Sequence, residues 1–419
     1  MSERGRALAL VSLAQLLAMS LWFGVSAVAP AIVSEWRLSA AAASWLTVAV
    51  QLGFVAGTLV SALLNLADVV NVRTLFAVSA VMGGAVNLLL VLRAQDGATA
   101  IVLRFLTGVC LAGVYPPGMK IIATWFRQGR GLALGILVGA LTLGKASPYL
   151  INAAGSSNWR LTAGLPSVFA LAAGAVVLFF VRDGPDALPP QKFDLAQVAD
   201  IVRNRGVRLA NFGYFGHMWE LYAMWTWAPV MMRQSILRSG GARWVGELAS
   251  FVVIGSGAIG CVVAGRLADR IGRAEVASAA MIVSGICCVV IGLLFGAAPW
   301  ALMIVAAVWG ASVVADSAQF SACVTELSDP RYIGTALTLQ TCIGFLITSV
   351  SIQLMPPAVA AVGWRFAFIL LAPGPILGTV AMLRLRRVQG APRIAQSQPR
   401  SVTPAGLFDD SSTGTPPSF

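Results

Sequence analysis

The chain has 419 residues, of which 58% are hydrophobic and 11% are charged, and its formal net charge is +12. Soluble domains usually carry about 25% charged residues, so this composition excludes an ordinary soluble domain and indicates an integral membrane protein. Basic residues gather in short connections between apolar runs, the pattern of loops on the cytoplasmic side; the charge therefore predicts no nucleic-acid partner.

Apolar runs long enough to cross a bilayer as helices recur along the whole chain. Alternating ten-residue strands are missing, so the fold class is all-α integral membrane. The first run is too long for the apolar part of a signal peptide and is interpreted as an uncleaved span. Twelve spans are expected, at about 7–29, 43–66, 74–93, 98–122, 131–153, 162–181, 207–231, 245–266, 275–296, 299–323, 333–355 and 365–384.

Charge and composition divide the chain into four parts. Residues 1–181 would form an N-terminal six-helix bundle, 182–206 a cytoplasmic linker and 207–387 a C-terminal six-helix bundle, with 388–419 a disordered cytoplasmic tail. The even number of spans and the distribution of arginine place both termini in the cytoplasm. The halves also repeat short strings at similar spacing, LAD at 66–68 and 267–269, and NWR at 158–160 against GWR at 363–365, which indicates a duplicated unit.

Two loop segments carry a family likeness. AGRLADRIGRAE (264–275) resembles the motif G-x-L-x-D-R-x-G-R of the major facilitator superfamily, and the first-half copy keeps Asp68 but has Arg73 displaced by one position. The fourth span adds an R-x-x-x-G match at Arg104 and Gly108. This resemblance implies two pseudo-symmetric six-helix bundles around a central cavity, lined by spans 1, 4, 7 and 10. It also implies a gate made by Asp68, Arg73, Gly265, Asp269, Arg270 and Arg273.

The loop motif also has a physical interpretation. Asp269 follows a span, where a carboxylate can meet a helix N-terminus or a neighbouring arginine. Such a contact would hold the cytoplasmic side closed in one conformer. Plain topological charge is the alternative.

Charged residues deep in spans are costly and usually functional. Two cations, Arg104 and Lys145, lie in the first half, and two anions, Glu220 and Asp316, lie in the second. Arg104 could hold an anion in bidentate fashion or could only bond helix carbonyls. Lys145 could face the cavity and attract an anion, could bond Glu247 of the opposite bundle, or could extend its ammonium to the membrane surface.

The seventh span, FGYFGHMWELYAMWTW, holds the chain's single histidine, His217, one turn before Glu220. Both side chains bind protons, so the pair is a candidate coupling site, while a purely structural pair of these two residues is the alternative. Asp316 joins them as a third candidate. Gln15, Trp22, Tyr115 and Gln319 are the further candidates for lining the substrate site, and Trp219 and Trp225 are possible walls.

These features predict a monomeric secondary active transporter of the cytoplasmic membrane that moves a small organic or inorganic anion with protons. Proton-driven efflux of drugs or other cations, with Glu220 and Asp316 as the cation site, is the alternative within transport. A non-transporting membrane receptor is the alternative of another class. The sequence shows no enzyme motif, so no catalysis, cofactor or metal is expected.

Overall fold

The computed structural model describes residues 2–126, 129–154, 158–186, 197–329 and 332–396. The regular elements within these ranges are all helices. The first half contains α1 (Glu3–Ala27), α2 (Ala29–Trp36), α3 (Ala40–Leu63), α4 (Leu66–Val69), α5 (Val72–Arg93), α6 (Gly97–Ala112), α7 (Tyr115–Trp125), α8 (Arg130–Ala153) and α9 (Trp159–Phe180). The second contains α10 (Val198–Arg203), α11 (Arg205–Arg238), α12 (Arg243–Gly255), α13 (Gly257–Ile271), α14 (Arg273–Leu293), α15 (Pro299–Ala315), α16 (Ser317–Leu327), α17 (Ile333–Ala367), the 3-10 turn η2 (Phe368–Leu371) and α18 (Pro373–Gln396).

These helices account for all twelve expected spans. Ten segments of the described chain are long and apolar enough to cross a membrane, and one of them, Ile333–Val388, contains both α17 and α18. Helix α11 supplies the remaining span, although its many polar residues keep it outside that apolar set. Three spans are built from two helices each, α6 with α7, α12 with α13, and α15 with α16.

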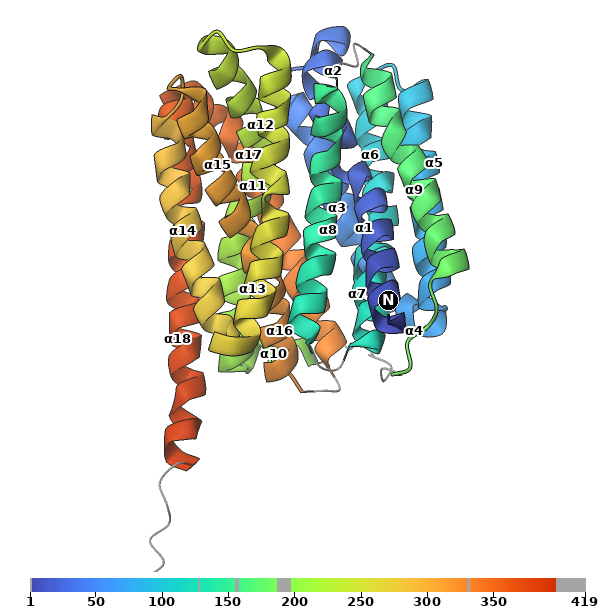
Figure 1. Ribbon diagram of the computed structural model, residues 1–419, viewed down its shortest axis with the longest axis vertical. Coiled ribbons are helices and arrows are strands. Elements are labelled where there is room, and N and C mark those ends of the chain that lie inside the picture. The colour runs from blue at the N-terminus through green and yellow to red at the C-terminus, as the bar shows by residue number, and fades with distance from the viewer. Residues whose placement is uncertain (1, 127–128, 155–157, 187–196, 330–331, 397–419) are drawn as a thin grey trace, which may run out of the picture.

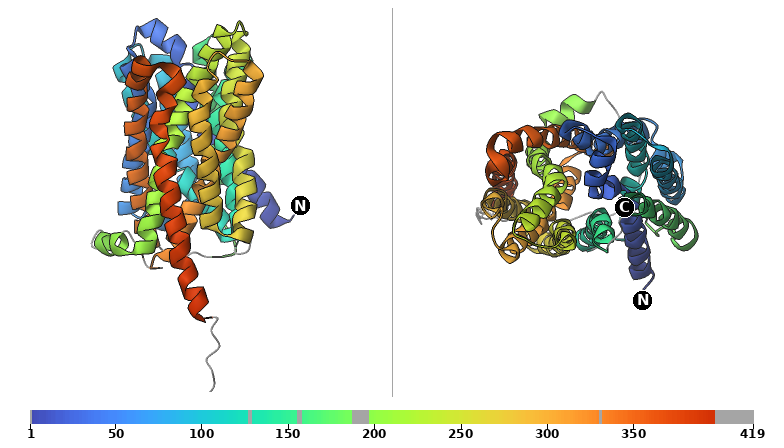
Figure 2. Two further views of the ribbon diagram at one scale, coloured as in Figure 1. Left: turned by 90° about the vertical axis from the view of Figure 1, so that its left-hand side faces the viewer. Right: turned by 90° about the horizontal axis from the view of Figure 1, so that it is seen from above.

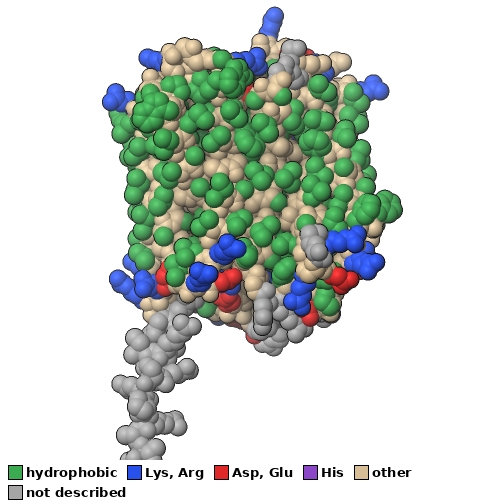
Figure 3. Space-filling view, viewed as in Figure 1, with side chains coloured by type: hydrophobic (Ala, Val, Ile, Leu, Met, Phe, Trp, Pro, Cys, Tyr) green, Lys and Arg blue, Asp and Glu red, His purple; other side chains and the backbone are tan. Residues whose placement is uncertain are grey.

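The helices stand side by side as a bundle (Figure 1). Helices of the first half gather on one side and those of the second half on the other, as the view from above shows (Figure 2). Helix α10 and the end of α18 lie at the lower end in Figure 1, here called the terminal end, and α2 lies at the opposite end. Hydrophobic side chains cover the middle of the face in Figure 3, while charged side chains gather toward its two ends, as expected for a membrane-embedded surface.

The C-terminal segment differs from the expectation of a disordered tail over 388–419. Helix α18 continues to Gln396, so the first part of that segment is helical, and residues 397–419 lie outside the described chain. The linker 182–206 is described only in part. It contains the short helix α10, and residues 187–196 lie outside the described chain.

The two halves meet along α8, which packs against α12 and α13, and along α3, which packs against α17. Glycine allows the closest of these approaches. A Cβ atom at Gly135 of α8 would lie 2.6 Å from the carbonyl oxygen of Cys261 in α13, and one at Gly265 would lie 2.6 Å from that of Gly131. Small residues at such positions let membrane helices approach backbone to backbone.

Within the first half, α3 and α6 form the most extensive helix pair, and we expect its glycines to be essential. A Cβ at Gly53 would overlap the carbonyl oxygen of Phe105, so Gly53→Ala should lower the free energy of unfolding by about 1–3 kcal/mol. The measurement is unfolding of the purified protein in detergent, followed by circular dichroism. Gly164→Ala is the matched control, since its Cβ would meet only Val91 Cγ1, at 3.6 Å. Equal destabilisation by both substitutions would contradict this account of the α3–α6 contact.

Candidate functional site

Lys145 of α8 places its ammonium group among aromatic rings at the boundary between the two halves. The side chain is 2% exposed, and Nζ donates a hydrogen bond of 2.5 Å to the hydroxyl of Tyr222 in α11. Nζ also lies 3.9 Å from the ring centroid of Trp22, 4.6 Å from that of Tyr222 and 5.0 Å from that of Trp225. We call Lys145, Trp22, Tyr222 and Trp225 the aromatic cage.

The cage is continued by phenylalanine rings from both halves. Phe54 of α3 lies 5.2 Å from Trp22 between ring centroids, and Phe345 of α17 lies 5.7 Å from Trp22 and 5.1 Å from Tyr222. Phe54 and Phe345 are 4.7 Å apart. Because α1, α3 and α8 belong to the first half while α11 and α17 belong to the second, any relative movement of the halves must rearrange this cluster.

The charge of Lys145 is only partly compensated by the protein. Among the described residues, no carboxylate lies within ion-pair distance of Nζ. Each desolvated cation–π contact stabilises an ammonium by about 2 kcal/mol, whereas removing an ammonium from water costs several kcal/mol. The indole N–H groups of Trp22 and Trp225 also have no acceptor in the described chain. The cage therefore combines one cation with two unused donors, which suits an anion.

Helix α11 explains how the cage and the titratable residues arise from one stretch of sequence. At about 100° per residue, Tyr222 and Trp225 share one face of the helix, and His217 and Glu220 share roughly the opposite face. The first face contacts Lys145 and Trp22 of the first half. The second face contacts α14, α15 and α16 of the second half.

The sequence suggested that His217 pairs with Glu220, but in the structure the two side chains bond to other residues. His217 Nδ1 lies 2.8 Å from Asp316 Oδ1, and its Nε2 lies 3.2 Å from the hydroxyl of Ser317. All three proton-binding side chains, His217, Glu220 and Asp316, are at most 2% exposed. The interpretation failed because it considered neighbours on one helix only, while the nearest groups come from the break between α15 and α16.

Glu220 is held by two neutral donors. Its Oε1 accepts a hydrogen bond of 2.7 Å from the Ser284 hydroxyl and one of 2.6 Å from the indole N–H of Trp309. Neither donor was a sequence candidate, because one buried serine and one buried tryptophan among many carry no distinguishing signal. This carboxyl group points into the second half and away from the cage.

Asp316 occupies the short interruption between α15 and α16. Gln319, expected at the substrate site, accepts a hydrogen bond of 3.4 Å from Arg273 Nη1. It therefore lies with the loop-motif residues at the terminal end.

Arg104 does not face a substrate site, which corrects its assignment as an anion-binding residue. The side chain is 0% exposed, and Nε and Nη1 donate to the carbonyl oxygens of Leu46 (3.1 Å) and Leu21 (2.8 Å). Nη2 donates to the carbonyl of Trp22. The guanidinium thus joins α6 to α1 and α3 and fixes the stretch of α1 that carries Trp22. This is the structural role that the sequence analysis gave as the alternative.

Three further candidates occupy different places. Gln15 of α1 is fully buried against Gly118, and its amide has no partner among the described residues. Tyr115 is half-buried at the first turn of α7, just before two prolines. Trp219 donates to the carbonyl of Leu370 at 3.0 Å, so it packs within the second half and does not wall the cage.

The loop motif of the second half forms a contact between the halves at the terminal end. The carboxylate of Asp269 lies against Gly131, in the first turn of α8, as an anion at a helix N-terminus should. Arg273 donates to Glu326 Oε1 at 2.7 Å. Arg270 and Arg273 line an adjoining cleft of about 710 Å³.

The first-half copy of the motif forms different pairs. Asp68 lies 2.5 Å from Nζ of Lys120, and Arg73 lies 2.9 Å from Asp183, which follows α9. Arg73 ties α5 to the start of the linker, so it does not replace the missing arginines of the motif.

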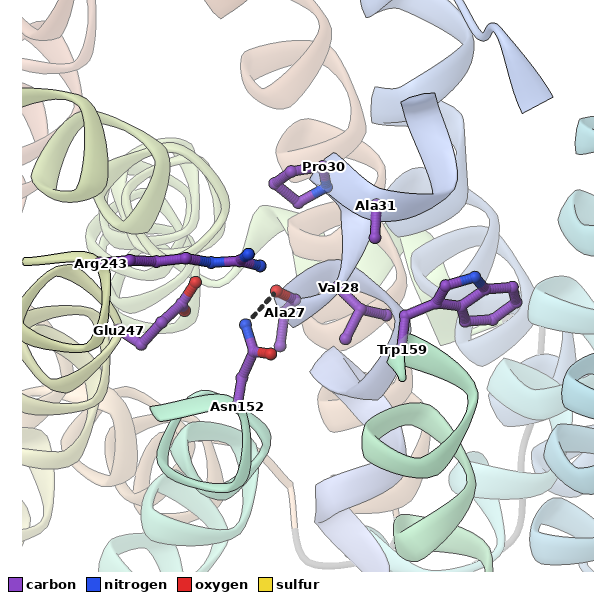
Figure 4. Close-up of a pocket in the computed structure, with 8 residues that line it drawn as sticks. All are labelled: Ala27, Val28, Pro30, Ala31, Asn152, Trp159, Arg243 and Glu247. Carbon is purple, nitrogen blue, oxygen red and sulfur yellow. Dashed lines mark hydrogen bonds between the residues drawn. The ribbon is translucent and has the colours of Figure 1, made fainter. Parts of the chain in front are cut away.

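A small pocket of about 20 Å³ lies near the end of the molecule that carries α2. Figure 4 shows Arg243 and Glu247 of α12 on one side of it, with Asn152 of α8 and Val28 on the other. Glu247 is bonded to Arg233 at 3.4 Å, which rules out the sequence-based alternative that it pairs with Lys145.

Comparisons with known proteins agree with this architecture. The family model described as Major Facilitator Superfamily matches residues 11–352 and, in a second match, residues 212–411. The MFS-type transporter pytF of Aspergillus terreus is 29% identical over 175 residues. That alignment covers 40% of this chain and 56% of the relative, so the chain spans about half the length of this curated protein.

The first family match alone covers well over half of the chain, and the resemblance inferred from the loop and fourth-span motifs is confirmed. The twelve spans agree with it. The chain therefore belongs to the Major Facilitator Superfamily and is a multi-pass membrane protein.

Proposed function

We propose that this transporter moves a small organic or inorganic anion by alternating access, coupled to protons, with Lys145 as the residue that holds the anion. The observation that carries this proposal is a buried ammonium between the two halves, with a tyrosine hydroxyl and aromatic faces as its neighbours but no carboxylate among the described residues. An anion would supply the missing charge.

Hydrogen-bond donors around the cage support the same choice. The indole N–H groups of Trp22 and Trp225 are buried without an acceptor in the described chain. A buried donor without a partner costs about 1–3 kcal/mol, and a carboxylate or another oxyanion would offset that cost. A cationic substrate would leave both donors unused and would repel Lys145.

The coupling protons are assigned to the opposite face of α11. His217, Asp316 and Glu220 are buried proton-binding groups next to hydroxyl and indole donors. His217 and Glu220 belong to the same helix as Tyr222 and Trp225, and Asp316 contacts that helix through His217. A change in the charge of these three groups can therefore alter the position of the cage residues. Proton-driven cation efflux is the weaker proposal, because these carboxylates bond inside the second half rather than at the boundary.

The remaining parts of the proposal concern gating and placement. Asp269 at the N-terminus of α8 would stabilise the conformer that is closed at the terminal end.

We place the chain as a monomer in the cytoplasmic membrane with both termini inside. Support comes from the even number of spans and from the arginines of 182–208, 266–273 and 384–387 in terminal-end connections.

Anion binding should depend on the charge of Lys145. Lys145→Gln should weaken binding of anions at least tenfold, about 1.4 kcal/mol, whereas Lys145→Arg should retain part of it. The measurement is thermal stabilisation of the purified protein across a concentration series of benzoate, acetate, sulfate and phosphate.

The matched control is Lys120→Gln, which removes a lysine that already has Asp68 as its partner and should leave the anion affinity unchanged. Stabilisation by tetraphenylphosphonium and by none of the anions would overturn the anion assignment and favour cation efflux.

Proton coupling should depend on Glu220 and Asp316. Glu220→Gln keeps an oxygen that can accept from Ser284 and Trp309 but cannot exchange a proton, and Asp316→Asn does the same beside His217. In proteoliposomes, each variant should lose accumulation driven by a pH gradient, by about tenfold or more. Each should keep counterflow exchange of labelled substrate, which needs no net proton movement.

Glu35→Gln is the control for this experiment. Hydrogen bonds from Arg160 and Trp159 hold the pKa of Glu35 below its usual value, and the residue lies in α2, outside the spans. Its replacement should leave gradient-driven accumulation intact. Normal accumulation by both the Glu220 and the Asp316 variants would contradict the coupling assignment.

A further inference from the structure

We infer that the transported anion is a monocarboxylate with a flat aromatic body. This inference rests on the proposed function and specifies the substrate class of the same site. It follows from three properties of the cage: its charge, its donors and the nature of its walls.

The charge of the cage matches one negative charge. Lys145 supplies one ammonium, and the nearby buried guanidinium of Arg104 is already bonded to three backbone carbonyls. In the described chain, Lys145 is the cation recorded over the faces of the Trp22, Tyr222 and Trp225 rings. A dianion such as phthalate, sulfate or hydrogen phosphate would therefore bring a buried charge without a partner, which is strongly disfavoured.

The donors of the cage match a carboxylate. Nζ of Lys145 and the Tyr222 hydroxyl are already bonded to each other, and the indole N–H groups of Trp22 and Trp225 have no acceptor among the described residues. A carboxylate offers two oxygens with about four acceptor positions. Together with the ammonium, these two N–H groups make three donors on the cage residues, for which a carboxylate has enough acceptor positions.

The walls of the cage favour an aromatic body. Five rings surround the ammonium or lie against those that do, and all are at most 4% exposed: Trp22, Phe54, Tyr222, Trp225 and Phe345. Neighbouring rings are tilted by 39° to 73° to one another. An aromatic ligand gains from face-to-edge contacts with such walls beyond the area it buries, whereas a saturated ring of similar size gains from area alone.

Binding of an aromatic acid would also change which groups contact the ring faces of the cage. In the structure the ring faces stabilise the ammonium of Lys145. Once a carboxylate pairs with that ammonium, the ring faces become available to the ligand's own ring edges. One set of rings therefore serves Lys145 before binding and the aromatic body after binding.

The test compares four acids on the full chain in detergent, with affinities measured by isothermal titration calorimetry at neutral pH. Benzoate should bind about fivefold or more tightly than cyclohexanecarboxylate, which has the same charge and a saturated ring. Phthalate, a dianion, should bind at least tenfold more weakly than benzoate, and acetate should bind more weakly than benzoate as well.

A matched pair of substitutions tests whether the rings at the cage cause the preference for benzoate over cyclohexanecarboxylate. Phe54→Leu removes a cage wall, while Phe368→Leu removes an equally buried ring that packs on Trp309 and Trp364 in the second half. The first should reduce the ratio of benzoate to cyclohexanecarboxylate affinity, and the second should leave it unchanged. Because the readout is a ratio within one variant, a general loss of stability does not imitate the result.

Other results would distinguish failure of the aromatic-monocarboxylate inference from failure of the proposed anion function. Equal affinity for benzoate, cyclohexanecarboxylate and acetate, still lost in Lys145→Gln, would overturn the aromatic inference and leave the anion proposal standing. Tighter binding of phthalate than of benzoate would overturn the single-charge argument. No measurable binding of any of the four acids would overturn this inference. It would also overturn the proposed anion function if sulfate and phosphate failed to stabilise the protein in the thermal measurement.

Discussion

The central constraint in this structure is a lysine ammonium enclosed at the boundary between two helical halves. Lys145 has a tyrosine hydroxyl and three aromatic faces as its neighbours, and removing such a charge from water is costly. The rings that offset this cost come from α1 in one half and α11 in the other. The ammonium of Lys145 thus has all three ring faces as neighbours only while the halves are placed as in this structure, so its environment must change whenever they move.

Helix α11 connects the cage around Lys145 with the buried proton-binding residues. One face contributes Tyr222 and Trp225 to the cage, and the opposite face contributes His217 and Glu220 to contacts with Asp316, Ser284 and Trp309. A rigid helix transmits a shift or rotation from one face to the other without any chain of specific contacts. In the proposed function, coupling between anion and proton needs only that protonation of the second face changes how α11 packs. A ligand can shift a conformational equilibrium only through different interaction energies in its two states.

Much of the fold was predictable from the sequence, because membrane spans obey a simple rule of length and apolarity. The twelve spans, the helical class and the loop motif with Asp269 all follow from local patterns. The site was less predictable. Arg104 and Lys145 look alike as cations in apolar runs, but one is saturated by backbone carbonyls and the other is not. That difference depends on which helices approach each other, information that spacing along one helix does not contain.

The same limit explains the error at His217. Residues three apart on a helix are neighbours, so pairing His217 with Glu220 was reasonable, yet Asp316 reaches His217 from the interruption between α15 and α16. A broken helix places a side chain where a continuous helical stripe would not. In the central region of this bundle, His217 meets Asp316 at such an interruption, and Lys145 lies at the boundary between the halves. Arg104, in the uninterrupted packing of α1, α3 and α6, serves the fold instead.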